Sequence, residues 1–205
     1  LPGFDFTAFY ARGGILGPLR DKNSLPMLTV QGFGDHQVAM NLAAGVLAAL
    51  FKAKMTGEGD HVVVSLFHSA IWDISLMLQA SQYGADSTQY PMERWKLGNP
   101  LVLCYETADG QWLQIAMPQY DRHYPILMNA MGYPELADDA RYYPQKNLIP
   151  NREEFSAWIT AEFKKKTCDE WCKLLDANDL PYAIAQEWDS LLEDKQAWAS
   201  DCFYE

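Results

Sequence analysis

The spacing of apolar and polar residues changes several times along the chain, and each spacing predicts a different element. Residues 37–54, QVAMNLAAGVLAALFKAK, are apolar on almost every side and free of proline, and they end in a basic turn before MTGEG. This pattern predicts a buried helix. The β-branched run HVVVSL at 61–66 predicts a strand, and residues 67–83 predict a second apolar helix. A helix, a fully apolar strand and a helix together indicate a layered α/β core.

Turn-forming residues mark the segments on either side of this core. Residues 1–34 contain many Gly, Pro and aromatic residues, and they predict loops around one short helix near Phe6 to Ala11. After Gly84 the stretch ADSTQYPMERWKLGNP is polar and rich in turn residues, which is typical of a crossing between domains.

The pattern beyond this crossing predicts a smaller α+β unit. The segment LVLCYETADGQWLQIAM alternates on both sides of an Asp-Gly pair, which predicts a β-hairpin. The sequence TCDE fits a capping box, in which Thr167 caps a helix and the Glu170 side chain reaches back to it. This pattern predicts the start of a helix. The same rules predict helices at 120–131, 152–166, 169–177 and 188–198, and a short strand at 183–186.

Composition and charge narrow the classes of protein. With 205 residues and 49% hydrophobic content, the chain can bury one core, or one core and a smaller satellite. No window reaches about 18 consecutive apolar residues, and the first residues lack the pattern of a secretory signal. The net charge of -11 disfavours binding to nucleic acid or anionic lipid. We therefore expect a cytoplasmic protein with no membrane or nucleic-acid partner.

The four cysteines predict packing thiols rather than a metal or redox site. Cys104 and Cys202 are isolated, while Cys168 and Cys172 lie one helical turn apart in CDEWC. This spacing matches neither a zinc knuckle nor a redox CxxC pair. We expect no metal site.

The strongest candidate for chemistry is GFGDHQ, immediately before the predicted helix. Gly32 and Gly34 let the backbone bend and let a bulky ligand approach, while Asp35 lies at the helix start, where the dipole favours an anion. On the pattern alone, an N-cap is the favoured explanation of Asp35, because Asp is among the commonest caps. His36 is a possible general base, but no second histidine is patterned with it, which favours a structural role.

Other polar residues have simpler explanations. Ser65 and Ser69 lack a GxSxG setting, and the sequence has neither GxGxxG nor a Walker motif. Turns or caps explain four further acids, which are Asp5, Glu58, Asp60 and Asp109.

The ordered motifs PGFD, ARGG, GFGDHQ, AAGVLAALFKAKMTGEGD, VSLFHSA, ETADGQW and CDEW resemble those of the family III CoA-transferases, and in particular the branch that acts on (R)-2-hydroxy acids. Such enzymes are about twice as long as this chain. The resemblance implies an α/β fold with a Rossmann-like large domain and a small α+β domain. Residues 1–92 would be the C-terminal portion of the large domain, 93–186 the small domain, and 187–205 a helical return toward the large domain.

The resemblance also implies a mechanism. Asp35 would be the nucleophile, forming an aspartyl anhydride and then an aspartyl-CoA thioester, with Gly32 and Gly34 supplying room and amide donors. We expect substrate and CoA to contact Gly32, Phe33, Gly34 and His36, and we assign Gly98 and Asn99 to the mobile loop that covers the site in this family. The acyl-CoA thioester is then a substrate, with no permanently bound cofactor. The whole protein is expected to be an interlocked homodimer.

Three alternatives differ from this hypothesis. The first is a transferase of the same family that acts on carnitine, oxalate or a bile acid. The second is an α-methylacyl-CoA racemase, in which a histidine precedes the aspartate of the motif matched by PGFD; here that position is Phe4. Loss of this histidine counts against proton exchange by two bases. The third is a non-catalytic dimerization fragment.

Overall fold

The computed structural model describes residues 3–84 and 90–204, and the chain divides into two compact units, Leu1–Arg94 and Trp95–Glu205. Of the polar stretch expected to cross between domains, residues 85–89 lie outside the described residues. The finer division at 92 and 186 stays a prediction.

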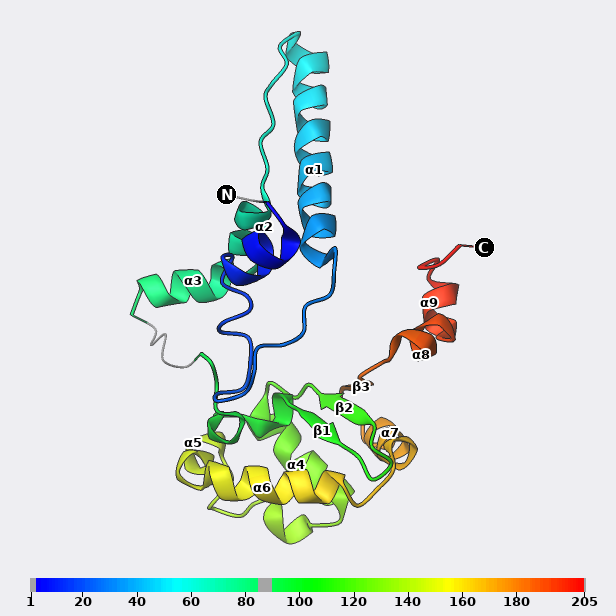
Figure 1. The fold of residues 1–205 in the computed structure, drawn as a ribbon. Coiled ribbons are helices and arrows are strands. Elements are labelled where there is room, and N and C mark those ends of the chain that lie inside the picture. The colour runs from blue at the N-terminus through cyan, green and yellow to red at the C-terminus, as the bar shows by residue number, and fades with distance from the viewer. Residues whose placement is uncertain (1–2, 85–89, 205) are drawn as a thin grey trace. The chain divides into compact units, whose positions relative to one another are not determined.

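The first unit is built from helices and long connections (Figure 1). Its elements are the π-helix η1 (Asp5–Ala11), α1 (Phe33–Thr56), α2 (Leu66–Asp73) and α3 (Ser75–Gln82). The short helix and the long apolar helix are therefore confirmed in position, although α1 begins four residues before the predicted start at Gln37. The predicted second helix is two helices, because the backbone leaves helical geometry at Ile74 (φ -98°, ψ 8°).

The prediction that the long helix is buried was wrong for the described residues. Gly34 is the only buried residue of α1, and the side chains of Met40, Leu47, Phe51 and Met55 are between 66% and 70% exposed. Apolarity on every side predicts a helix covered on every side. Here η1, α2 and the segment that returns from α1 cover only part of its surface (Figure 1). By length and composition α1 could also cross a membrane, a criterion that core helices of soluble proteins meet as well.

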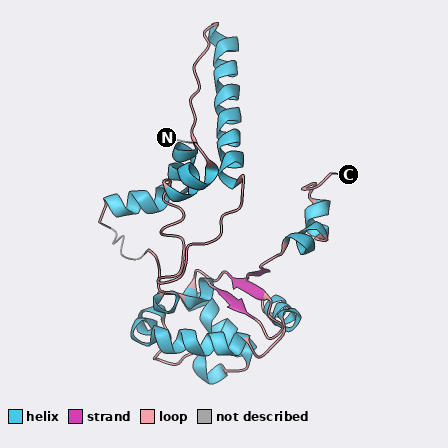
Figure 2. Ribbon diagram, viewed as in Figure 1, coloured by secondary structure: helices cyan, strands magenta, loops and turns pink. Residues whose placement is uncertain are grey.

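The predicted strand at 61–66 is not formed. Residues 61–65 run beside α1 as a loop (Figure 2), and α2 begins at Leu66 after Ser65, whose Oγ accepts from the backbone N–H of His68. Val62 lies so close to Gly45 that a Cβ there would come within 2.6 Å of it. A β-branched run favours an extended backbone, but a strand also needs a partner, and the described residues of the first unit supply only the bridge Asp21↔Met92. The layered core predicted around this strand is therefore absent from that part of the chain.

The second unit contains a small antiparallel sheet, and its predicted hairpin is confirmed (Figure 2). Strand β1 (Cys104–Glu106) pairs with β2 (Trp112–Ile115), and β2 pairs with β3 (Tyr182–Ile184). Gly110 adopts φ +77° in the turn, a conformation that glycine reaches without steric cost.

Helices complete this unit, and most lie where the sequence predicts them. The capping box is confirmed, because Thr167 Oγ1 accepts from the Glu170 N–H while the Glu170 carboxylate accepts from the Thr167 N–H. Asp194 caps a second short helix in the last segment, so the single helix predicted there is two. The α-helices are α4 (Tyr120–Met131), α5 (Gln145–Leu148), α6 (Arg152–Phe163), α7 (Cys168–Ala177), α8 (Trp188–Leu192) and α9 (Lys195–Ala199), and the 3-10 turns are η3 (Arg94–Lys96), η4 (Pro100–Val102), η5 (Pro134–Leu136) and η6 (Ile149–Asn151).

Stacked aromatic rings join the sheet to the helices of the second unit. The ring of Phe163 stacks on Tyr105 of β1 and on Trp171 of α7, with centroids 4.6 Å and 4.4 Å apart. The indole N–H of Trp171 donates to the Phe163 carbonyl (2.8 Å), so this large side chain is buried without an unsatisfied donor. The buried residues of this core all belong to the second unit.

Candidate functional site

The turn into α1 carries most of the predicted site residues. Gly32 is the N-cap, with φ +83°, and its carbonyl accepts the backbone N–H of His36 (2.9 Å). Asp35 is the third residue of the helix and lies in its first turn. Its predicted place at the helix start is confirmed, whereas its interpretation as the N-cap was wrong, because Gly32 has that position.

The Asp35 side chain is exposed, and no described residue donates a hydrogen bond to its carboxylate or forms an ion pair with it. The neighbouring His36 side chain is also exposed. Asp35 is therefore an accessible carboxylate, and a nucleophile has to be accessible to its substrate.

Asp5 holds the backbone of this turn from a distant part of the sequence. Its side chain is only 6% exposed; Oδ2 accepts the N–H of Gly32 (2.9 Å) and Oδ1 accepts the N–H of Gly34 (3.1 Å). The sequence interpretation, in which a local turn or cap explained Asp5, missed this contact. The available signal was an acid within the otherwise apolar run GFDFTAF, since a buried charge requires partners.

The aromatic residues of η1 support the same turn. Phe9 is fully buried beneath Gly34, where an added Cβ would lie 2.3 Å from Phe9 Cγ and 2.4 Å from Asp5 Oδ1. The Tyr10 hydroxyl donates to the Val30 carbonyl (3.3 Å), and the Phe33 ring lies 6.2 Å from the rings of both Phe9 and Tyr10. Residues of η1 thus contact the segment from Val30 to Gly34 through a carboxylate, an aromatic ring and a hydroxyl.

These contacts bear on the expected role of the two glycines, whose contact with substrate and CoA stays a prediction. Both amides, predicted to stabilise oxyanions of the substrate, donate to Asp5. The space left by the missing side chain of Gly34 is filled by Phe9 and Asp5 rather than by a ligand. An amide that already donates to a carboxylate has no hydrogen left for an oxyanion, so in this conformation the glycines shape the turn.

Gly98 and Asn99 belong to the second unit and have local contacts there. The Asn99 side chain accepts from the Leu101 N–H (2.9 Å) and donates to the Met117 carbonyl (3.1 Å), while the Gly98 carbonyl accepts from the Gln145 side chain (3.1 Å). Asn99 is therefore the N-cap of η4. The assignment of both residues to a loop over the site stays a prediction.

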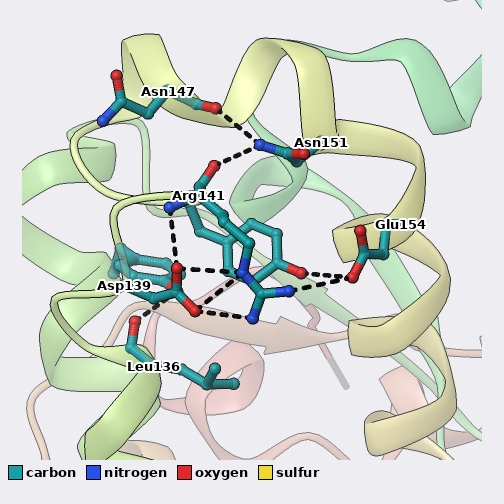
Figure 3. Close-up of polar contacts among 8 residues, drawn as sticks. Leu136, Asp139, Arg141, Asn147, Asn151 and Glu154 are labelled. Carbon is teal, nitrogen blue, oxygen red and sulfur yellow. Dashed lines mark hydrogen bonds and ion pairs between the residues drawn. The ribbon is translucent and has the colours of Figure 1, made fainter.

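A polar cluster in the second unit links the connection after α4 to helix α6 (Figure 3). Arg141 donates to both oxygens of Asp139, with a shortest distance of 2.8 Å, and lies 3.5 Å from the Glu154 carboxylate. Hydrogen bonds from Arg141 lower the pKa of Asp139. The Glu154 carboxylate also accepts from the Tyr142 hydroxyl (2.8 Å), and the Asn151 side chain donates to the Arg141 carbonyl (2.9 Å). Two carboxylates neutralise this arginine, so the cluster indicates a structural role.

The cysteines are free thiols in different environments. Cys168 is buried and Cys202 is exposed. The pKa of the Cys168 thiol is raised to about 11, mainly by burial and to a smaller extent by the neighbouring Cys172. Within the described ranges, no three His, Cys, Asp or Glu side chains gather as a metal site.

We expect Cys168 to resist alkylation of the folded protein at neutral pH, because the thiolate is the reactive form and a raised pKa keeps the sulfur protonated. Its modification by iodoacetamide should rise as the pH approaches about 11. Peptide mapping by mass spectrometry measures this reaction, with the exposed Cys202 as the control that reacts first. Equal rates at Cys168 and Cys202 at neutral pH would contradict the expectation.

Comparison with known proteins defines the class. The profile of CoA-transferase family III matches residues 1–205, and the chain belongs to this family. It is 46% identical over 205 residues to the cinnamoyl-CoA:phenyllactate CoA-transferase of Clostridium sporogenes, covering 100% of this chain and 50% of that protein. It is 38% identical over 203 residues to the (R)-2-hydroxy-4-methylpentanoate CoA-transferase of Clostridioides difficile, covering 99% of this chain and 50% of that protein. The chain spans about half the length of the curated relatives it matches.

Solved structures show the same fold. A hypothetical protein of Mycobacterium tuberculosis aligns with a TM-score of 0.79 and 25% identity over 98% of this chain and 52% of that one. A CaiB/BaiF family protein of Brucella suis aligns with a TM-score of 0.80 and 21% identity, and the alignment covers 97% of this chain and 52% of that one. The chain therefore has the family III fold over about half of these structures, as helices with a small sheet.

Proposed function

We propose that the whole protein moves CoA from an acyl-CoA to a carboxylic acid, with Asp35 as the covalent nucleophile and a 2-hydroxy acid as one of the acids. Membership of the family and similarity to two transferases named for a 2-hydroxy acid or phenyllactate support this substrate class. The observation that carries the assignment to Asp35 is its exposed carboxylate in the first turn of α1.

The first half of the reaction needs an ionised carboxylate that reaches a thioester. A carboxylate oxygen of Asp35 attacks the thioester carbonyl, the C–S bond breaks, and the products are a mixed anhydride and CoA thiolate. The thiolate then attacks the aspartyl carbonyl, which forms an Asp35–CoA thioester and releases the donor acid as a carboxylate. The activation passes from the donor acyl group to the aspartyl group and is not lost to water, so no nucleotide hydrolysis is required.

The second half repeats these steps in reverse. The acceptor carboxylate attacks the Asp35–CoA thioester to give a new anhydride and CoA thiolate. The thiolate attacks the acceptor's carbonyl, which releases the new acyl-CoA and restores the Asp35 carboxylate. Because both glycine amides of the turn donate to Asp5, donors for the transient oxyanions have to come from other groups.

The rest of the proposal concerns the whole protein. We propose that the first unit is part of a Rossmann-like large domain, that the second is the small domain, and that two copies interlock as a cytoplasmic homodimer. The uncovered apolar surface of α1 supports this, because side chains such as Leu47 and Phe51 are more stable when covered by protein than in water. No resident cofactor is required by the chemistry proposed.

Trapping the covalent intermediate tests the proposal. The whole protein is incubated with a 2-hydroxyacyl-CoA and then with borohydride, which reduces a thioester, or hydroxylamine, which captures an activated acyl group. Peptide mapping should find the modification on Asp35. Protein treated without acyl-CoA is the control, and a label on another residue, or no label during turnover, would refute the assignment.

The same incubation in deuterium oxide separates the transferase from a racemase. A racemase exchanges the α-hydrogen of the acyl group without modifying the aspartate, whereas a transferase modifies Asp35 and leaves that hydrogen in place. Phe4, which replaces the histidine of the racemase motif, is 67% exposed and offers no base. We expect modification without exchange.

A further inference from the structure

Asp5 is a buried carboxylate that the proposed chemistry does not use. We propose that Asp5 is a positioning residue, which fixes the direction of the Asp35 carboxylate by holding the amides of Gly32 and Gly34. This inference rests on the proposed function, because it assigns Asp5 a part in delivering the nucleophile.

The contact is long-range and uses both carboxylate oxygens. Asp5 is 27 residues from Gly32 and 29 residues from Gly34 along the chain, and one oxygen accepts from each amide, at 2.9 Å and 3.1 Å. Asp5 lies in the first turn of η1, yet its side-chain bonds run to α1 rather than to its own helix. One carboxylate therefore holds the turn at two amides, and these two hydrogen bonds form a clamp at the start of α1.

The clamp holds two residues on the N-terminal side of Asp35. Gly32 precedes the helix with φ +83° and Gly34 adjoins Asp35 directly, so the backbone on the N-terminal side of Asp35 is fixed at two points. The Phe9 ring beneath Gly34 and the bond from Tyr10 to the Val30 carbonyl restrict the same segment. The Asp35 carboxylate has no hydrogen-bond partner among the described residues, so its direction depends on the backbone that carries it.

The expected consequence is kinetic. A nucleophile displaced by about 1 Å from its reacting carbonyl can lose about 100-fold in rate, although the substrate still binds. Loosening the clamp should therefore lower kcat and leave the KM for acyl-CoA nearly unchanged. A residue that only stabilised the fold would lower the amount of folded protein, and the kcat of each folded molecule would stay the same.

Asp5→Asn in the whole protein tests this with a side chain of the same shape. The carboxamide offers one acceptor oxygen, and its NH2 group would face the other amide as a second donor. We expect kcat per folded active site to fall about 100-fold, with KM changed less than about threefold. Asp5→Glu keeps both acceptors on a longer chain and should recover part of the loss. Asp60→Asn is the matched control, because that carboxylate also accepts from a backbone N–H, that of His61 (2.9 Å), beyond the C-terminal end of α1, and it should leave kcat unchanged.

Borohydride trapping counts the active sites and separates the possible outcomes. Wild-type label on Asp35, with slow labelling of a folded Asp5→Asn variant, supports the inference. Labelling of Asp5→Asn at the wild-type rate overturns it and leaves the proposed function intact. A loss of activity that follows only the loss of folded protein, measured by thermal unfolding, also overturns it. Wild-type label on Asp5 instead of Asp35 overturns both proposals.

Discussion

Replacing Asp35 by alanine in the whole protein is expected to lower the rate of CoA exchange between acids by about 10,000-fold or more. Removing the carboxylate removes the atom that forms the anhydride, and no other described group in the turn can replace it: Asp5 is buried and engaged with two amides, and His36 has no carboxylate. Stability should change little, because the Asp35 side chain is exposed and forms no hydrogen bond or ion pair with described residues. The measurement is the steady-state rate of acyl-CoA formation, followed by chromatography.

Two further variants make this result specific. Asp35→Glu keeps a carboxylate but moves it by one methylene, so we expect activity between those of the wild type and Asp35→Ala. Asp169→Ala removes an exposed carboxylate from the first turn of α7, a similar position on another helix, and should leave exchange unchanged. Undiminished exchange in Asp35→Ala would refute the covalent mechanism.

Replacing Gly34 by alanine should destabilise the protein and reduce transfer. In a helix, alanine is ordinarily favoured over glycine by about 1 kcal/mol, so propensity alone predicts stabilisation. Gly34 is different, because its added Cβ would lie 2.3 Å from Phe9 Cγ, 2.7 Å from Phe9 Cβ and 2.4 Å from Asp5 Oδ1. Phe9 Cβ is attached to the backbone and cannot move aside alone. We expect overpacking to dominate and lower the free energy of unfolding by about 1–3 kcal/mol.

Chemical unfolding of the whole protein measures this change, and the rate of Asp35 labelling measures its effect on the site. Gly59→Ala is the control, because an added Cβ there meets no atom within 4 Å and its backbone needs no positive φ. A Gly34→Ala variant as stable as the wild type would show that Phe9 and Asp5 can move apart. It would also weaken the inference that this turn is rigid.

The sequence was sufficient to predict those elements whose deciding contacts are local. The hairpin follows from alternation around Asp109 and Gly110, and the capping box of α7 from Thr167 and Glu170, which are three residues apart. The position of α1, with Asp35 in its first turn, follows from an apolar run that a glycine-rich turn precedes. The motifs also carried the family resemblance, and the family profile confirms it over the full length of the chain.

Contacts between residues far apart in the sequence decided the features that the sequence did not predict. The run at 61–66 favours an extended backbone, but pairing requires a neighbouring strand that no local pattern specifies. Apolarity predicted that α1 would be covered, yet which surfaces are covered depends on the segments that reach it. Asp5 resembled a local cap until the fold brought it to Gly32 and Gly34, across 27 and 29 residues. A pattern of neighbouring residues reports propensity and local capping, whereas the partner of a buried charge is set by the path of the whole chain.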